Sequence, residues 1–369
     1  MAKRGQGEGS ISKRPDGTWW ARITVGRTDN GKQKRKAFYG KTRREVQEKL
    51  TAAVNEINNN SYIECSKMTV EQWLKFWLHE YKKRVLKPST FAKYYSKIGQ
   101  INPHIGNIKL KDLRREHVQQ LVNGMADKKA AATVTDTYKI LKWSLNKAVD
   151  DNLIRTNPCS KVVLPKNDKV LPRVLSSAEQ EEFERIANQS YHGKGLIILV
   201  YTGLRIGELI GLTWNHVDFE NETIRIEQSV TESMNYDGDK PKVEKFVGTP
   251  KTRASIRTIP LVPKVLEIFR ELKEDYPFSK EYVFAQPDGS IARYVPFYSL
   301  TKTIGKEMKI DGLHPHCLRH TFATRCLERG INLKVAQELL GHYSIKITAD
   351  MYTQATSDVK KELIMKLAN

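Results

Sequence analysis

The most reactive side chains gather near the carboxyl end, between Gly312 and Thr353. This stretch holds a His-x-x-Arg pair formed by His316 and Arg319, a Leu-Gly-His that ends at His342, and Tyr352 ten residues later. A tyrosine hydroxyl, with a pKa near ~10, attacks phosphorus at neutral pH only with help from a base and cations. Arginines stabilise the charge that develops on a phosphodiester, and histidine or lysine can move the protons. These residue types therefore predict phosphodiester cleavage.

Two upstream motifs could complete this stretch. Arg205 lies in TGLRIGEL, where its side chain could be half-buried. A half-buried arginine needs an anionic partner. Glu208, three residues on, or a bound phosphate could be that partner, and the residues alone do not decide between them. Lys251 lies in TPKTRASIRTIPL on the shoulder of an expected hairpin, where most lysines are solvated. The leaving oxygen needs a proton, which a lysine or a histidine can give, but the sequence around Lys251 does not by itself single it out for that role.

Other chemistries use fewer of these residues. His316 and His320 stand four apart and could share a metal, but no acidic residue lies between them and no second cysteine pair completes a zinc site. Cys317 is adjacent to His316, but neighbours on a helix point about 100° apart, which disfavours a thiol nucleophile. The chain has neither a Gly-x-x-x-x-Gly-Lys-[Ser/Thr] loop nor an acidic cluster suited to Mg²⁺. We therefore expect no metal and no cofactor.

Length and charge predict how the rest of the chain serves this chemistry. The 369 residues carry a net charge of +20, which predicts a polyanionic partner. Residues 1–64 hold 14 Lys and Arg against 7 Asp and Glu, and residues 65–168 hold 20 against 9. Residues 169–369 are almost neutral, with 28 against 26. We expect three domains with these bounds, of which the first two grip DNA.

Residues 1–64 predict a three-stranded antiparallel sheet followed by a helix. Strands are expected at about 8–14, 18–26 and 32–39, separated by Pro-Asp-Gly and Asp-Asn-Gly turns, with the helix at 41–58. Such a sheet can enter a DNA major groove, although a solvated basic hairpin would look the same. The candidate DNA contacts are Arg22, Lys32, Lys34, Arg35 and Lys36.

Residues 65–168 predict a four-helix domain. Its helices are expected at about 69–83, 87–102, 114–125 and 131–150, followed by a linker at 157–174. An aromatic stripe in the first helix is expected to be core rather than a base-stacking surface. Basic residues spread over several helices suit phosphate contacts, although each lysine alone is typical of a solvated surface. The candidate contacts are Lys87, Lys93, Lys97, Lys139 and Lys142.

Residues 169–369 predict a mainly helical domain with a small sheet. Strands are expected at 223–230 and 257–261, with a polar insertion at 231–244 between them. A helix capped by Ser177, an apolar helix at 195–201 and a short helix containing Tyr352 are also expected. Further helices are expected at 263–273, 315–329, 334–340 and, as a tail, 357–367. The predicted fold class is therefore mixed and mainly α.

Five sequence boxes resemble, in order and spacing, the signature of the tyrosine site-specific recombinases, the phage integrase family. They are TGLRIGEL, TPKTRASIRTIPL, HPHCLRHTFAT, LGH and the later Tyr352, and the match extends over most of 175–355. Residues 65–168 resemble that family's core-site DNA-binding domain. Residues 1–64 resemble the arm-site-binding domain of integrases from phages and conjugative transposons. The chain as a whole most resembles the integrases of conjugative transposons.

The resemblance implies a role for each reactive residue. Arg205 and Arg319 would hold the scissile phosphate, and Glu208 would brace the arginines. Lys251 would protonate the leaving 5′ oxygen, although Lys242 and Lys245 lie nearby in the sequence. His316 would help to accept the tyrosine proton, His342 would bond the phosphate, and Tyr352 would form a 3′-phosphotyrosyl link.

The resemblance also implies the partners. A homotetramer would act on double-stranded DNA at element ends, arm-type sites and a target site, through a four-way junction. An excisionase and a host DNA-bending protein would assist. The alternatives are a type IB topoisomerase, which would relax DNA, and a catalytically silent DNA-binding regulator. Unpaired cysteines, no signal peptide and no long apolar run predict a cytoplasmic protein without a membrane partner.

Overall fold

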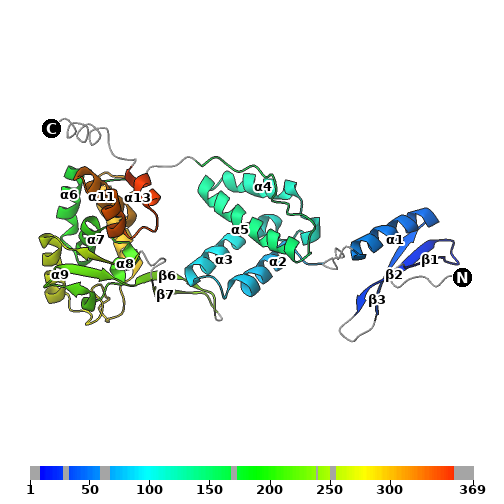
Figure 1. Cartoon of the computed structure of the whole chain (residues 1–369), viewed down its shortest axis with the longest axis horizontal. Helices are drawn as coiled ribbons and strands as arrows, with labels where there is room; N and C mark the ends of the chain where they lie inside the picture. Colours follow the sequence, from blue (N-terminus) through cyan, green and yellow to red (C-terminus); the bar gives the residue numbers. More distant parts are fainter. Residues whose placement is uncertain are drawn as a thin grey trace. The chain divides into compact units, whose positions relative to one another are not determined.

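A computed structural model describes residues 9–27, 33–58, 67–167, 173–237, 240–249 and 255–352 (Figure 1). The fold is mainly helical with small antiparallel sheets, which confirms the predicted class. Contacts divide the chain into two compact units, 1–167 and 168–369. The domain boundaries expected after residues 64 and 168 lie outside the described residues, so the three-domain division stays a prediction. In the described part, no helix is long and apolar enough to cross a membrane.

The first unit begins with the predicted sheet and helix. Strands β1 (Ser10–Lys13), β2 (Trp19–Arg27) and β3 (Gln33–Gly40) pair antiparallel in that order, and α1 (Arg43–Asn58) follows. The turn before β2 is closed by Asp16, whose Oδ1 accepts from the Thr18 amide at 3.0 Å, and Gly17 takes φ +84°. The core between sheet and helix contains buried Ala21, Ile23, Val46 and Leu50.

A helical bundle completes the first unit. It contains α2 (Val70–Phe76), a π-helical turn η1 (Trp77–Lys82), α3 (Pro88–Ile105), a 3₁₀ turn η2 (Leu110–Asp112), α4 (Arg115–Ala126) and α5 (Ala131–Asp150). The predicted capping box begins α2, since the Gln72 amide donates to Thr69 Oγ1 at 3.3 Å and the Thr69 amide donates to Gln72 Oε1 at 3.0 Å.

Two expectations about the bundle need correction. The second helix was expected to end at Asn102-Pro103, but α3 continues to Ile105. Ile101 and Ile105 are buried on the core face, and this packing offsets the backbone hydrogen bond that Pro103 cannot donate. The aromatic stripe is core at Trp73 and Trp77, each 1% exposed, whereas Tyr81 is 37% exposed and donates to Asp151 Oδ2 at 2.9 Å.

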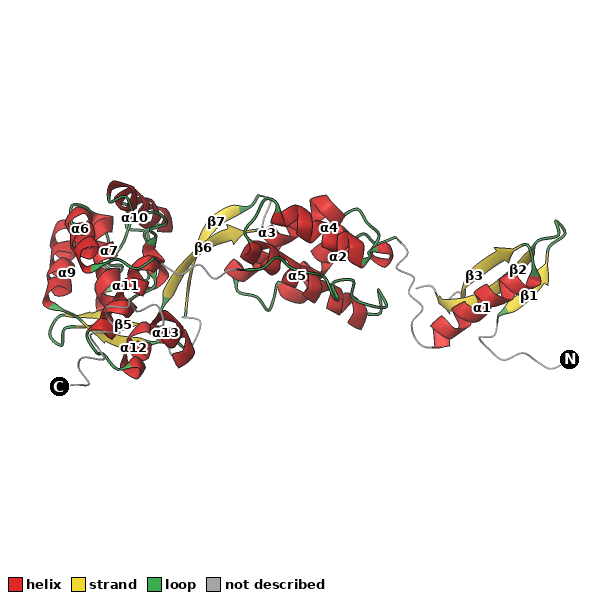
Figure 2. Cartoon of the chain, turned by 90° about the horizontal axis from the view of Figure 1, so that it is seen from above, coloured by secondary structure: helices red, strands yellow, loops and turns green. Residues whose placement is uncertain are grey.

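The second unit is built around one apolar helix, α7 (Tyr191–Thr202), which other helices of the unit cover. Its residues 196–199 have no exposed surface, because α6 (Ser177–Ala187), α9 (Pro263–Asp275), α10 (Tyr294–Glu307) and α11 (Pro315–Glu328) pack against it (Figure 2). The remaining helices are α8 (Ile206–Ile210), the 3₁₀ turn η3 (Trp214–His216), α12 (Leu333–Leu340) and α13 (Ile345–Tyr352). An antiparallel sheet joins β4 (Val217–Asp218), β5 (Thr223–Ile226) and β8 (Arg257–Pro260).

The second unit departs from the prediction at several points. The strand expected at 223–230 ends at Ile226, and the polar insertion forms a separate hairpin of β6 (Ser229–Asn235) and β7 (Lys242–Gly248), visible in Figure 2. Helix α10 was not predicted. The cap of α6 is Ser176 rather than Ser177, since the Glu179 amide donates to Ser176 Oγ at 3.2 Å. The expected tail helix at 357–367 lies outside the described residues.

Candidate active site

Arg205 lies where α7 ends and α8 begins, and the local sequence fixes it there. Gly203 ends α7 with φ +64°, and a Cβ at this residue would lie 2.4 Å from the Phe322 ring. Arg205 is the N-cap of α8, and Glu208 Oε2 accepts its backbone amide at 3.0 Å. Glu208 Oε1 accepts from the Arg205 guanidinium at 2.7 Å. Glu208 is therefore the structural partner of Arg205, whose side chain stays 39% exposed.

Arg319, on α11, is fully buried beside Arg205. Its two terminal nitrogens donate to the carbonyl oxygens of Gly203 and Leu340, each at 2.6 Å. Its Nε is buried and has no partner among the described residues. Burial, and then the charge of Arg205, lower the pKa of Arg319 to about 9, so it is still charged at neutral pH. The site therefore holds two arginine charges close together.

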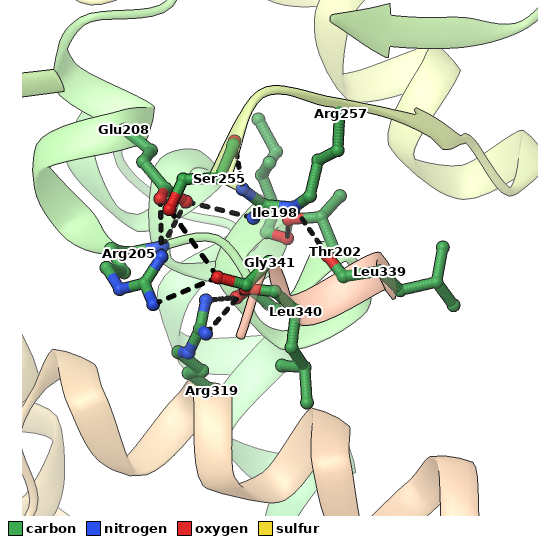
Figure 3. Close-up of polar contacts among 11 residues, drawn as sticks. Ile198, Thr202, Arg205, Glu208, Ser255, Arg257, Arg319, Leu339, Leu340 and Gly341 are labelled. Carbon is green, nitrogen blue, oxygen red and sulfur yellow. Dashed lines mark hydrogen bonds and ion pairs between the residues drawn. The ribbon is translucent and has the colours of Figure 1, made fainter. Parts of the chain in front are cut away.

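The carboxyl end of α12 gathers both arginines. The carbonyl of Leu340 accepts from Arg319, and that of Gly341 accepts from Arg205 at 3.5 Å (Figure 3). The last carbonyls of a helix have no partner within the helix and carry partial negative charge, so cationic donors stabilise them. Gly341 then turns the chain with φ +64°, which favours glycine. The Leu-Gly-His box thus forms a helix end that two arginines bind.

His342 follows that turn and is buried, with 5% of its surface exposed. Its Nδ1 lies 2.9 Å from Thr348 Oγ1 on α13, and its backbone carbonyl accepts from Gln337 at 2.9 Å. Burial, followed by nearby arginine charges, lowers the pKa of His342 to about 3, so its ring is neutral at physiological pH. Tyr352 is the last residue of α13, which packs on α11 and α12. The structure describes the backbone of Tyr352 and not its side chain.

His316 lies one turn before Arg319 on α11 and is open to solvent. The surrounding protein and then the charges of its neighbours still lower its pKa to about 4, so the ring is neutral at pH 7. His320, which is buried, places its ring 4.7 Å from the His316 ring in an edge-to-face arrangement. A neutral, accessible imidazole of this kind can accept a proton.

The remaining expectations about the chemistry have mixed outcomes. Lys251 lies outside the described residues, between β7 and β8, so its role stays a prediction. Burial raises the pKa of Cys317 above its ordinary value, which disfavours a thiolate there. Among the described residues, no three His, Cys, Asp or Glu side chains are arranged to hold a metal ion.

Sequence reasoning missed Arg257. Its guanidinium donates to Glu208 Oε2 at 2.9 Å and to the carbonyl oxygen of Leu339 at 2.6 Å. Residues two apart on a strand face the same side, and Ile259 on β8 is buried. The alternation in RTIPL was therefore the signal that Arg257 points inward, toward the site.

The structure separates the predicted DNA contacts of the N-terminal sheet. Arg22 and Arg35 are exposed on the sheet face opposite α1, where the Arg22 guanidinium lies 4.1 Å from the Trp20 ring centre. Lys36 pairs in register with buried Ile23 and so belongs to the α1 side, although it is exposed. Lys34 is on β3 without a described side chain, and Lys32 lies outside the described residues.

Three of the five predicted contacts in the helical bundle converge. Lys93 on α3 binds Asp136 on α5 at 2.7 Å, and the charges of Lys139 and Lys97 also help to lower the pKa of Asp136. Lys87 and Lys142 do not join this group: Lys87 is at the start of α3, and Lys142 is exposed on α5. Their roles in binding DNA stay predictions.

Comparison with known sequences identifies a family for most of the chain. Residues 168–358 match the phage integrase family, and residues 69–126 match the phage integrase N-terminal SAM-like domain. A tyrosine recombinase XerC-like protein from Caldanaerobacter subterraneus subsp. tengcongensis is 31% identical across 94% of this chain and 94% of its own length. The transposase of transposon Tn916 from Enterococcus faecalis is 28% identical over 69% of this chain and 65% of its own length.

Solved structures show the same fold. The Tn1549 transposon integrase in complex with a circular intermediate DNA aligns with a TM-score of 0.69 at 23% identity, covering 81% of this chain and 99% of that chain. A lambda integrase dimer bound to a COC′ core site aligns with a TM-score of 0.61 at 19% identity, covering 95% and 96%. The family matches favour site-specific recombination over the topoisomerase and regulator alternatives. The chain belongs to the phage integrase family and is a tyrosine recombinase, an enzyme that breaks and rejoins DNA strands.

Proposed function

We propose that this recombinase integrates and excises a mobile element, with Tyr352 as its nucleophile. One observation carries the proposal. Arg205 and Arg319 come from separate sequence boxes, yet they bind the neighbouring carbonyls of Gly341 and Leu340. The chain continues from there into His342 and the helix that ends at Tyr352. One turn therefore connects two phosphate-binding cations, a neutral histidine and the nucleophile.

The proposed step balances without a cofactor. The Tyr352 hydroxyl oxygen attacks phosphorus, a 3′-phosphotyrosyl bond forms, and the bond from phosphorus to the 5′ oxygen breaks. His316 accepts the phenolic proton, and Lys251 gives a proton to the 5′ oxygen. Arg205 and Arg319 stabilise the developing negative charge, while Glu208 holds Arg205 in place. Attack by a 5′ hydroxyl from another strand reverses the step and rejoins the DNA.

The proposed reaction requires an assembly of several protomers. Two duplexes need four nucleophiles, so four protomers would act on element ends, arm-type sites and a target site through a four-way junction. The lambda integrase, which shares the fold, has been solved as a tetramer bound to a Holliday junction. An excisionase and a host DNA-bending protein would set the direction. We also propose that the reaction takes place in the cytoplasm.

A nicked suicide substrate carrying an element end tests the nucleophile. Loss of the short strand after cleavage traps the covalent intermediate. The full chain should form a protein–DNA adduct in EDTA, and Tyr352→Phe should form none. Tyr343→Phe is the matched control, because Tyr343 is 71% exposed and close in sequence. An adduct that persists in Tyr352→Phe would show that the nucleophile is wrong.

A second experiment tests the proton donor. Lys251→Ala should cleave an ordinary substrate slowly. It should recover on a substrate whose leaving 5′ oxygen is replaced by sulfur, since a thiolate leaves without a proton. Lys242→Ala is the control, because the Lys242 side chain is 67% exposed and paired with Glu244. If sulfur rescues Lys242→Ala instead, the donor is Lys242.

A further inference from the structure

Three successive carbonyls at the end of α12 each accept from a different arginine. Leu339 accepts from Arg257, Leu340 from Arg319 and Gly341 from Arg205 (Figure 3). These arginines come from β8, from α11 and from the start of α8. The family resemblance gives roles to the second and third arginines and none to Arg257.

Arg257 directs its whole guanidinium group at the protein. Its Nε donates to Leu339, one terminal nitrogen donates to the Ser255 carbonyl at 3.0 Å, and the other binds Glu208 at 2.9 Å. Its side chain is 6% exposed, against 39% for Arg205. Each nitrogen is therefore already engaged, and Arg257 is poorly placed to bind DNA itself.

We propose that Arg257 is a positioning residue for strand cleavage: it links Glu208, which holds Arg205, to the helix end that leads to His342 and Tyr352. The inference rests on the proposed function, because it concerns the geometry of that same site. Arg205 also donates to Glu208 and to the end of α12, but its bond to the Gly341 carbonyl is long, at 3.5 Å. Arg257 donates to the Glu208 carboxylate at 2.9 Å and to the Leu339 carbonyl at 2.6 Å. It therefore fixes the phosphate-binding side relative to the nucleophile side.

The charge of Arg257 also affects how Arg205 can bind a phosphate. Glu208 is 2% exposed, and its carboxylate lies between Arg257 and Arg205, as Figure 3 shows. With Arg257 present, Arg205 need not neutralise Glu208 alone, so its charge remains available to a phosphate. Without Arg257, Arg205 would be the only ion-pair partner left to the buried carboxylate among the described residues, and the Leu339 carbonyl would lose its donor.

The same contacts predict that removal of Arg257 changes the pH dependence of the cleavage rate. Burial acts to raise the pKa of Glu208, but the charge and hydrogen bond of Arg257, followed by those of Arg205, hold it below its ordinary value. Arg319 from α11 also faces this carboxylate. Removal of Arg257 removes the largest lowering influence, so Glu208 should protonate at a higher pH. The acid limb of the cleavage rate should then move upward in pH.

The experiment measures single-turnover cleavage of the suicide substrate by the full chain at saturating DNA. Arg257→Met should lower the rate constant roughly 10- to 100-fold, the scale of a misplaced reacting group, while the Kd for DNA stays within about twofold. Arg257→Lys should be intermediate, because lysine keeps the charge but not the fork of donors. The Arg257→Lys variant also keeps the test valid if Arg257→Met folds poorly.

Arg325→Met is the matched control. Arg325 is 11% exposed and, like Arg257, donates to a carboxylate, Glu328, and to a backbone carbonyl, that of Leu175. Its loss should leave the cleavage rate unchanged. A double variant, Arg257→Met with Glu208→Gln, should cleave no more slowly than the worse single variant if both act as one unit.

Several results would overturn the inference. They are equal rates for Arg257→Met and Arg325→Met, a weaker Kd without a slower rate, or losses that multiply in the double variant. A different result would overturn the proposed function alone. If Tyr352→Phe keeps the adduct, the nucleophile is wrong, while the comparison of the arginine variants still stands.

Discussion

Acidification should destabilise the second unit through its buried histidines. His320 and His342 are 8% and 5% exposed, and their pKa values are lowered from 6.5 to about 4 and about 3. In the unfolded chain both rings titrate near 6.5. Between pH 6.5 and the lowered values, the unfolded state binds more protons than the folded state, so the free energy of unfolding must fall as pH falls.

The size of the effect follows from linkage. Each such group costs about 1.4 kcal/mol per pH unit below 6.5. At pH 5, which is about 1.5 units lower, each histidine should cost roughly 2 kcal/mol and the pair roughly 4 kcal/mol. His192 and His316 also have lowered pKa values and act in the same direction. The contribution of these histidines to the free energy of unfolding is therefore complete above pH 6.5 and is lost as the pH falls below it.

Hydrogen exchange of α7, read by mass spectrometry and corrected for intrinsic rates, reports the free energy of unfolding of this unit, since 196–199 are fully buried. His342→Gln should reduce the slope between pH 6.5 and 5 by about 1.4 kcal/mol per pH unit. His117→Gln, in the first unit on α4, is the control and should leave the slope of α7 unchanged. An unchanged slope in His342→Gln would refute the reasoning, because His342 would then protonate alike in both states.

Three further substitutions have expected outcomes. Gly203→Ala should lower the free energy of unfolding, measured by hydrogen exchange of α7, by about 2–4 kcal/mol, because alanine is strained at this left-handed φ and its Cβ clashes with the Phe322 ring. An unchanged free energy of unfolding would contradict that packing. Glu208→Ala should cost about 3–5 kcal/mol in the same assay, because buried Arg257 loses its anionic partner; a loss below 1 kcal/mol would mean that the ion pair is solvated. Thr69→Ala should lower the stability of the helical bundle by about 1 kcal/mol in urea unfolding, since Thr69 caps α2; Thr133→Ala, inside α5, is the comparison.

The sequence predicted the parts of the fold whose periodicity is strong. The Pro15-Asp16-Gly17 turn, the capping box at Thr69 and the apolar run in α7 are each signalled by residues close together in the sequence. Likewise, the three-residue spacing of Arg205 and Glu208 suits a bond across one helical turn, which the structure contains. Whether a phosphate also binds Arg205 was left open and stays a proposal.

Long-range packing decided what the sequence did not reveal. Helix α10 begins with Tyr294, Val295, Pro296 and Phe297, residue types that favour strands or turns, and it is helical because its inward face packs on α7. In the β6–β7 hairpin, Glu232 and Lys245 interrupt the apolar residues of one face, so the alternation is too weak to predict strands. Arg257 was missed for a related reason, since its partners are 49 and 82 residues away.

In the proposed reaction, Tyr352 forms the bond to DNA. The adduct trapped on the suicide substrate can be digested with a protease and a nuclease, and the modified peptide sequenced by mass spectrometry. We predict a nucleotide attached through its 3′ phosphate to Tyr352. Attachment to Tyr343, to a serine or through a 5′ phosphate would contradict the account.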